Sequence, residues 1–249
     1  MSHPTADGDT VEGAASDAEL AARETETATT AVDDAIAAFA RGEPVLIHDF
    51  ADREGETDLV YPATAVDPDA VARLRNDAGG LVCVALSAAV SDAFGLPFLQ
   101  EAIAHPAAAD HDLTYDERSS FSLTVNHRET FTGITDVDRA LTIGELGTAA
   151  AAVDADPESY GPEEFAAAFR TPGHVHLLRA APNLLADRRG HTELGLALAA
   201  AAGCAPAVVV CEMLDDETGG ARSPADAAAY AERHGFVYVE GAALVDRLG

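Results

Sequence analysis

Four carboxylates in one short stretch of the chain could bind a metal ion. Asp52, Glu54, Glu56 and Asp58 stand at every second position, shortly after the apolar run 45–47. If this stretch is extended, all four side chains point to one side, where they repel one another unless a cation lies between them. Hard divalent ions such as Mg²⁺ supply that charge. A solvated loop on a very acidic protein explains the stretch equally well.

Basic residues that could bind a phosphate occur at two places. Arg53, inside the acidic stretch, carries a planar fork that suits a phosphate or a carboxylate. Arg188, His191 and Thr192 precede the apolar segment 194–199, which predicts a helix that begins close to them. Since a helix N-terminus attracts anions through its unpaired N–H groups and its dipole, these residues predict a phosphate site. Taken alone, a histidine at a helix start is more often a cap than a metal ligand.

Two further segments could supply groups for proton transfer. The apolar run 207–211 predicts a buried strand that ends in Glu212. α/β folds place chemistry at the carboxyl ends of such strands, and burial would raise the pKa of Glu212 toward the range of a general base. A strand that simply ends in a polar residue is the alternative. His174 and His176 would face the same way on another strand, and we expect one of them to be structural.

The charge balance excludes several classes of function. The 249 residues include 43 acidic and 15 basic side chains, for a net charge of −28, and every basic residue is Arg. Without Lys, the chain cannot form a Schiff base, attach pyridoxal phosphate or build a Walker A loop. We expect no binding to nucleic acid or to an anionic membrane, because their phosphates would repel this chain. Such self-repulsion is tolerable where salt screens it, which suggests a halophilic protein in a salt-rich cytosol.

The cysteines and the N-terminus predict a cytoplasmic location. Cys83, Cys204 and Cys211 are odd in number, lack Cys-x-x-Cys spacing and lie in apolar surroundings, as reduced core thiols do. The N-terminus lacks the basic and apolar regions of a signal peptide. The longest Ala-rich run, 194–210, is interrupted by Gly and Pro, so we expect no membrane span.

The pattern of elements predicts one domain after a tail. Residues 1–29 have almost no large apolar side chains, which predicts a disordered acidic tail, and residues 30–249 form a single catalytic domain. Residues 95–118 are expected to be mostly loop, and a lid is one use for them. Short strands alternate with helices, which predicts an α/β or mixed α+β fold with a mixed sheet flanked by helices. The expected strands are 45–47, 59–62, 81–86, 121–125, 174–178, 207–212 and 237–239, and the expected helices include 32–40, 68–78, 141–146, 162–169, 194–202, 225–234 and 241–248.

Five sequence blocks together resemble the 3,4-dihydroxy-2-butanone 4-phosphate synthase family. They occur in the family's order and the resemblance covers residues 31–248. The first block has Thr57 where the commoner bacterial pattern has Gly, so the chain looks like the archaeal form, and it looks monofunctional because no GTP cyclohydrolase II domain follows. The blocks are Asp49-Phe50-x-x-Arg53-Glu54-x-Glu56-Thr57-Asp58, Thr132-Gly133-Ile134-Thr135-x-x-Asp138-Arg139, Pro172-Gly173-His174-Val175, Arg188-x-Gly190-His191-Thr192-Glu193 and Cys211-Glu212.

The resemblance implies a reaction and a metal. The family converts D-ribulose 5-phosphate into L-3,4-dihydroxy-2-butanone 4-phosphate and formate for riboflavin biosynthesis, using Mg²⁺ or Mn²⁺. Its members are homodimers with active sites near the interface, and their fold is a mixed α/β sheet packed with helices. Two alternatives stay open: a metal-dependent sugar-phosphate isomerase or class II aldolase, and a non-catalytic module that binds a phosphosugar.

The resemblance also assigns roles to residues of this chain. It implies that Glu54 and His191 hold the metal and that His174 and Glu212 transfer protons. The remaining residues of the implied site are expected to shape it, namely Asp49, Glu56, Cys83, Thr132 and Asp138. The implied substrate-binding residues are Arg53, Glu54, Asp58, Arg188, Arg189, Gly190, His191, Thr192 and Glu212.

Overall fold

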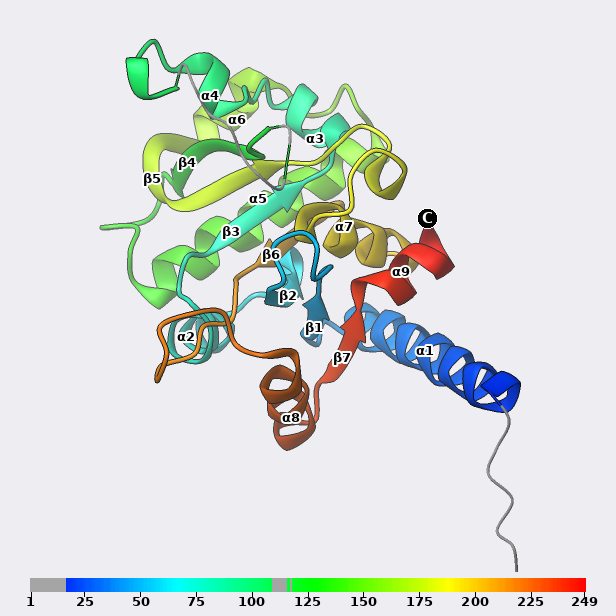
Figure 1. Cartoon of the computed structure of the whole chain (residues 1–249). Coiled ribbons are helices and arrows are strands. Elements are labelled where there is room, and N and C mark those ends of the chain that lie inside the picture. The colour runs from blue at the N-terminus through cyan, green and yellow to red at the C-terminus, as the bar shows by residue number, and fades with distance from the viewer. Residues whose placement is uncertain (1–16, 109–115, 117) are drawn as a thin grey trace, which may run out of the picture.

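One seven-stranded mixed sheet forms the centre of the molecule (Figure 1). The computed structural model describes residues 17–108, 116 and 118–249. The strand order across the sheet is β4-β5-β3-β6-β2-β1-β7. The pairs β1/β7 and β3/β5 are parallel and the other four are antiparallel. The strands are β1 (Val45–His48), β2 (Thr57–Pro62), β3 (Cys83–Leu86), β4 (Phe121–His127), β5 (Phe169–Arg179), β6 (Ala207–Val210) and β7 (Val237–Glu240).

Helices cover both faces of the sheet. Helices α1, α7 and α9 pack on one face, and α2, α3, α5, α6 and α8 pack on the other. The mixed α/β fold that the alternation of elements predicts is therefore confirmed. The helices are α1 (Asp17–Ala40), α2 (Pro68–Asp77), α3 (Ala88–Ala93), α4 (Leu99–Ala102), α5 (Asp136–Ala155), α6 (Pro162–Ala168), α7 (His191–Ala201), α8 (Pro224–His234) and α9 (Gly241–Leu248), with short 3-10 turns at Ala63–Ala65, Pro106–Ala108 and Leu184–Ala186.

The central strands are apolar on both sides because each side faces a core. In β1, Leu46 belongs to the core under α2 and α5, whereas Val45 and Ile47 belong to the core under α1 and α7. The same alternation occurs in β6, where Val209 faces the first core and Val208 the second. Adjacent side chains of a strand point to opposite faces, so a sheet covered on both faces needs continuous apolar runs rather than alternating ones.

Helix α7 is buried throughout its first nine residues. Residues 191–199 are all buried, and the helix contacts α1, α9 and the strands β1, β2, β3 and β6. The apolar sequence 194–199 leaves this helix no polar face, as expected for a helix inside a domain. The N-terminus of α7 is therefore held in a fixed position beside the central strands.

The helix α1 begins earlier than the sequence indicates. Residues 17–29 were expected to belong to a disordered tail, but α1 runs from Asp17 to Ala40. Ala and Glu make up seven of the thirteen residues 17–29, and both have high helix propensity even without an apolar face to bury. The rest of the expected tail, residues 1–16, lies outside the described residues.

Two other segments differ from the sequence-based elements. The strand expected at 174–178 begins earlier, since β5 runs from Phe169 to Arg179 through the Pro-Gly pair at 172–173 and pairs with β4. At Gly173 a Cβ would lie 1.9 Å from the carbonyl carbon of Val125, so only glycine allows the two strands to approach this closely. Within 95–118, α4 and a 3-10 turn interrupt the expected loop, and residues 109–115 and 117 lie outside the described part of the chain. No helix among the described residues is long and apolar enough to cross a lipid bilayer.

Candidate active site

The acidic stretch folds into a compact turn between β1 and β2. Buried Asp49 accepts hydrogen bonds from the backbone N–H groups of Glu54 (3.3 Å) and Glu56 (3.1 Å). The N–H of Arg53 donates to the carbonyl of Phe50 (2.9 Å). These bonds curl residues 50–54, so the stretch is not extended as the sequence pattern suggested.

Three of the four alternating carboxylates still reach one cavity. Glu54, Glu56 and Asp58 line it, whereas Asp52 is exposed and does not. The prediction for Asp52 was wrong because the tight turn at 51–54 breaks the alternation of the side chains. Asp49, expected only to shape the site, does so by holding the turn closed.

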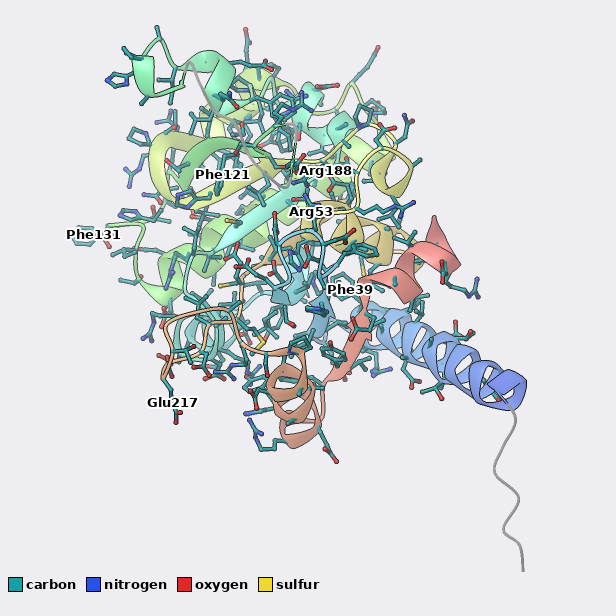
Figure 2. The ribbon with its side chains drawn as sticks, in the orientation of Figure 1. Phe39, Arg53, Phe121, Phe131, Arg188 and Glu217 are labelled. Atoms are coloured by element: carbon teal, nitrogen blue, oxygen red, sulfur yellow. The ribbon has the colours of Figure 1, made fainter. Side chains whose placement is uncertain are left out.

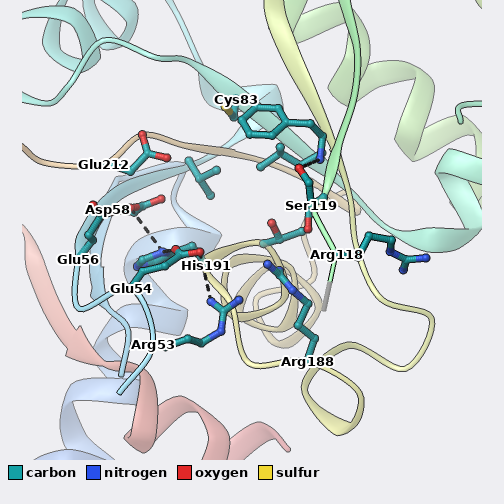
Figure 3. A pocket seen from close by; sticks show the side chains of 15 residues that line it. Arg53, Glu54, Glu56, Asp58, Cys83, Arg118, Ser119, Arg188, His191 and Glu212 are labelled. Atoms are coloured by element: carbon teal, nitrogen blue, oxygen red, sulfur yellow. Dashed lines mark hydrogen bonds and ion pairs between the residues drawn. The ribbon is translucent and has the colours of Figure 1, made fainter. Parts of the chain in front are cut away.

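His191, the first residue of α7, lies among these carboxylates (Figure 3). Its Nδ1 atom is 3.2 Å from Glu54 Oε2 and 3.6 Å from Asp58 Oδ1. Burial alone would lower the pKa of His191, but the charge of Asp58 and the hydrogen bond to Glu54 raise it to about 9. Burial alone would raise the pKa of Glu54, but the hydrogen bond with His191 lowers it below its usual value. The site therefore stabilises positive charge at this position.

Several atoms of this cluster fit a metal ion. One ligand atom each from Asp49, Glu54 and His191 lies within 4.8 Å of the other two. In the part of the chain that the structure describes, His191 Nε2 and Asp58 Oδ1 are buried without a hydrogen-bond partner. Buried polar atoms are normally paired, so these two atoms, on side chains that approach within 3.6 Å of each other, fit a cation as their partner. Carboxylate oxygens with one imidazole form a donor set that Mg²⁺ and Mn²⁺ accept.

Glu212 reaches the same cavity from the neighbouring strand. It forms an isolated antiparallel bridge with Asp58, and the N–H of Leu59 donates to the carbonyl of Cys211 (2.9 Å). Burial and the nearby negative charges raise the pKa of Glu212, and they raise that of Asp58 further. Because its pKa is raised, Glu212 is a candidate general base, which agrees with its predicted position after a buried strand.

Two guanidinium groups, those of Arg53 and Arg188, also line the cavity. Arg188 Nη1 donates to the buried carboxylate of Glu193 (2.7 Å), and Arg53 lies beside Arg188 (Figure 3). Gly190 sits between them: a Cβ there would lie 2.5 Å from Arg188 Nη1 and 2.8 Å from Arg53 Nη1. Thr192 also lines the cavity from the first turn of α7. We call Arg53, Arg188, Gly190 and Thr192 the cationic cradle.

The cavity has a volume of about 430 Å³, which suits a small metabolite. Cys83 lines it as expected, and burial raises the pKa of its thiol well above the usual range. Sequence patterns did not single out residues 118–121, which lead into and begin β4, because these residues show no spacing relation to the other motifs. Those additional lining residues are Arg118, Ser119, Ser120 and Phe121.

Arg189 and His174 are implied by the resemblance but do not line this cavity. Arg189 is an exposed residue. His174 is exposed on β5, where its N–H donates to Asn126 Oδ1 (2.8 Å) and its ring lies 3.2 Å from the Asn126 amide nitrogen. Asn126 also contacts the turn at Gly133, so His174 belongs to a second group of residues.

Thr132 and Asp138, which were expected to shape the site, lie in that second group. Asp138, at the start of α5, accepts hydrogen bonds from the N–H groups of Gly133 (2.8 Å), Thr132 (3.2 Å) and Phe131 (3.3 Å). The backbone N–H of Gly133 contributes most to lowering the pKa of Asp138. Thr132 and Asp138 therefore shape the turn beside His174 and not the cavity of the same chain.

The fold and the cavity together define a class of protein. A mixed α/β domain that joins a carboxylate and histidine cluster to a pair of arginines suits metal-dependent chemistry on a small phosphorylated substrate. Comparison with known proteins makes this specific. Residues 33–247 match the model of the family described as 3,4-dihydroxy-2-butanone 4-phosphate synthase, and the chain belongs to this family of enzymes.

Individual relatives agree with the family assignment. The synthase of Archaeoglobus fulgidus is 49% identical over 225 residues, which covers 86% of this chain and 92% of the relative. A solved synthase structure in complex with two magnesium ions has a TM-score of 0.72 at 29% identity and covers 87% of this chain and 95% of that one. The solved structure of a two-domain synthase from A. baumannii has a TM-score of 0.70 at 30% identity. The match covers 86% of this chain but only 56% of that longer protein.

Proposed function

We propose that this chain converts D-ribulose 5-phosphate into L-3,4-dihydroxy-2-butanone 4-phosphate and formate, the reaction of its family in riboflavin biosynthesis. One observation carries the proposal: a carboxylate and histidine cluster, a half-buried glutamate just beyond a buried strand and two arginines line a single cavity. The substrate needs a group that polarises its ketone, a base for a carbon-bound proton and a grip on its phosphate. The cavity offers one candidate for each task.

Glu54 and His191 would hold a divalent ion, Mg²⁺ or Mn²⁺. The distances around His191 and the raised pKa of its ring support this assignment, because a bound cation would replace the proton that the carboxylates stabilise. Such an ion supplies Lewis-acid polarisation of the ketone and its neighbouring oxygens. Asp49 would keep Glu54 in place through the closed turn.

The cationic cradle would bind the substrate phosphate. Guanidinium groups and a helix N-terminus are both suited to phosphate, and here Arg53, Arg188 and the first turn of α7 combine the two. Glu212 would accept the carbon-bound proton, since its raised pKa lies closer to the working range of a base. Asp58 lies next to Glu212 and would bind a substrate hydroxyl. Arg189 is exposed, so we propose at most a long-range electrostatic contribution from it.

His174 would act in the active site of a second copy of the chain. The turn next to it exposes three apolar side chains, with Phe131 92% exposed, Val137 65% and Ile134 51%. Figure 2 shows Phe131 projecting from the body of the molecule. Exposed apolar side chains that are grouped within seven residues of the chain are typical of an interface. We therefore propose a homodimer in which His174 of each copy enters the cavity of the other and transfers a proton there.

Mixing two inactive variants tests this arrangement. His174→Ser and Glu54→Gln should each abolish formate release, but subunit exchange should restore about a quarter of the activity, because half of the dimers are mixed and one of their two sites is intact. Analytical ultracentrifugation should show a dimer. Restoration would fail if His174 served the cavity of its own chain.

Formate release from ribulose 5-phosphate tests the reaction itself. We expect formate in the presence of Mg²⁺ and none after chelation. Turnover without formate would instead indicate the isomerase or aldolase alternative. Binding without turnover, from a protein that is folded by circular dichroism, would indicate a phosphosugar-binding module.

We also propose that the enzyme works in the cytoplasm of a salt-rich cell. The net charge of −28 is self-repulsive unless the ionic strength is high. The melting temperature should therefore rise steeply with KCl concentration. Full activity and an unchanged melting temperature in dilute buffer would contradict the halophilic interpretation.

A further inference from the structure

A carboxylate of the same chain already occupies the cationic cradle. Asp116 lies between the two guanidinium groups, and its Oδ2 atom accepts from Arg53 Nη2 (2.6 Å) and Arg188 Nε (2.6 Å). Arg188 Nη2 makes a further close contact with the same oxygen. A single carboxylate oxygen thus receives three charge-assisted contacts from two arginines that come from separate elements. This arrangement resembles what a phosphate oxygen would receive at the same place.

The other acidic partners of the two arginines are structural. Glu193 is fully buried in the first turn of α7 and also accepts the N–H of Ala181 (3.0 Å), so it is fixed. Asp49 and Glu54 lie 3.6 Å from Arg53 Nη1, which is beyond hydrogen-bond distance. Asp116 differs from them in position, because it belongs to neither the sheet nor α7. Of these four carboxylates, Asp116 alone stands where an incoming anion would bind.

We propose that Asp116 is an internal anion that holds Arg53 and Arg188 in the ligand-free enzyme and is displaced by the substrate phosphate. This inference rests on the proposed phosphate-binding role of the cradle. By pairing with both guanidinium groups, Asp116 fixes Arg188 and the Nη2 atom of Arg53 in the cradle, while Arg53 Nη1 faces Asp49 and Glu54 at 3.6 Å. Asp116 also makes the cradle selective among anions. A monovalent anion attracts the two arginines about as strongly as the carboxylate that it must displace, whereas a phosphate dianion attracts them more strongly.

The inference predicts that removal of this charge strengthens anion binding. In Asp116→Asn, inorganic phosphate no longer competes with a tethered carboxylate, so its Kd should fall about tenfold relative to wild type. Isothermal titration calorimetry with inorganic phosphate, at constant ionic strength and without divalent ions, measures this directly. Inorganic phosphate is the appropriate probe because it lacks the sugar hydroxyls that Asp116 could otherwise contact.

Three variants serve as controls. Asp33→Asn removes the same charge from the surface pair with Arg247 (3.7 Å) and should leave the Kd unchanged. Asp116→Glu retains the charge and should bind phosphate as weakly as wild type. Arg188→Gln should weaken phosphate binding in every background. Circular dichroism of each variant establishes that it is folded.

The outcomes separate the inference from the proposed function. An unchanged or higher Kd in Asp116→Asn, together with weaker binding in Arg188→Gln, would overturn the displacement model alone. Phosphate binding that is insensitive to Arg188→Gln would overturn the cradle and the inference with it, while formate release would still stand. If neither wild type nor Asp116→Asn binds phosphate measurably, the inference is also wrong.

Discussion

Replacing Gly190 with Ala should damage substrate binding without damaging the fold. Gly190 precedes α7 with φ −89° and ψ 170°, a conformation that alanine adopts freely. The added Cβ would lie 2.5 Å from Arg188 Nη1 and 2.8 Å from Arg53 Nη1, closer than any side-chain carbon tolerates. The neighbours that must move are the ends of two flexible side chains, so the backbone can stay in place while the cradle opens.

The size of the effect follows from the contacts that are lost. A hydrogen bond to a charged group contributes about 1.5–3 kcal/mol, so losing one such bond to the substrate phosphate should lower kcat/KM by a factor of about 10 to 150. Alanine is a poorer N-cap than glycine, which costs about 1 kcal/mol or less of stability. The catalytic loss should therefore greatly exceed the loss of stability.

Initial rates of formate release and a thermal melt of the same sample measure both quantities. Gly144→Ala is the matched control, because a Cβ at this position in α5 meets nothing within 4 Å. It should leave kcat/KM unchanged and stabilise the helix by about 1 kcal/mol. If Gly190→Ala retained wild-type kcat/KM, the two arginines would not be the phosphate site, and our reading of the cavity would fail.

Three further changes test other parts of the structure. Glu54→Gln should abolish Mg²⁺-supported turnover with the fold intact by circular dichroism, and retained activity would remove Glu54 from the metal site. Asp138→Asn should lower the melting temperature at pH 7, because hydrogen bonds to the turn at Gly133 lower the pKa of Asp138 and so stabilise its charged form in the folded protein. The difference in melting temperature between wild type and variant should disappear as the pH falls below the ordinary aspartate value of 3.8. A difference that persists in acid would mean that the charge of Asp138 does not stabilise the turn. Gly147→Ala should destabilise the protein by about 1–3 kcal/mol in urea unfolding, since its Cβ would lie 2.9 Å from the backbone nitrogen of Thr64, and an unchanged midpoint would show that the contact relaxes.

Local patterns predicted most of the elements near the site. The apolar runs at 45–47 and 207–211 indicated buried strands, and the polar residues directly after them indicated where chemistry could lie. The N-terminus of α7 was predicted from the change from polar to apolar residues at 191–194. These predictions succeed because burial on both faces of the sheet leaves a strong signal in the sequence.

The parts that depend on distant contacts could not be predicted. Asp52 and Glu54 occur at equally regular positions in the alternating pattern, yet only Glu54 lines the cavity. The difference arises from the hydrogen bonds that Asp49 makes to the turn. Nothing near Asp116 in the sequence relates it to Arg53 or Arg188, which lie 63 and 72 residues away. Strand β5 passes through Gly173 because a particular neighbour lies close to it, and a propensity argument treats the same Pro-Gly pair as a break.

The burial of α7 divides the site into two halves of unequal local stability. His191 begins a helix whose first nine residues are buried, so the hydrogen-bonded amides of α7 from Leu194 onward should exchange with solvent hydrogen only when the whole domain unfolds. Glu54 lies on a surface turn that is closed by a few hydrogen bonds, and such turns open by themselves at much lower free energy. A divalent ion that joined them would tie the turn to the core, so the protection it adds should appear at residues 50–56 and hardly at all in α7. The rigid half then fixes where the ion sits, and the turn governs how fast it enters and leaves.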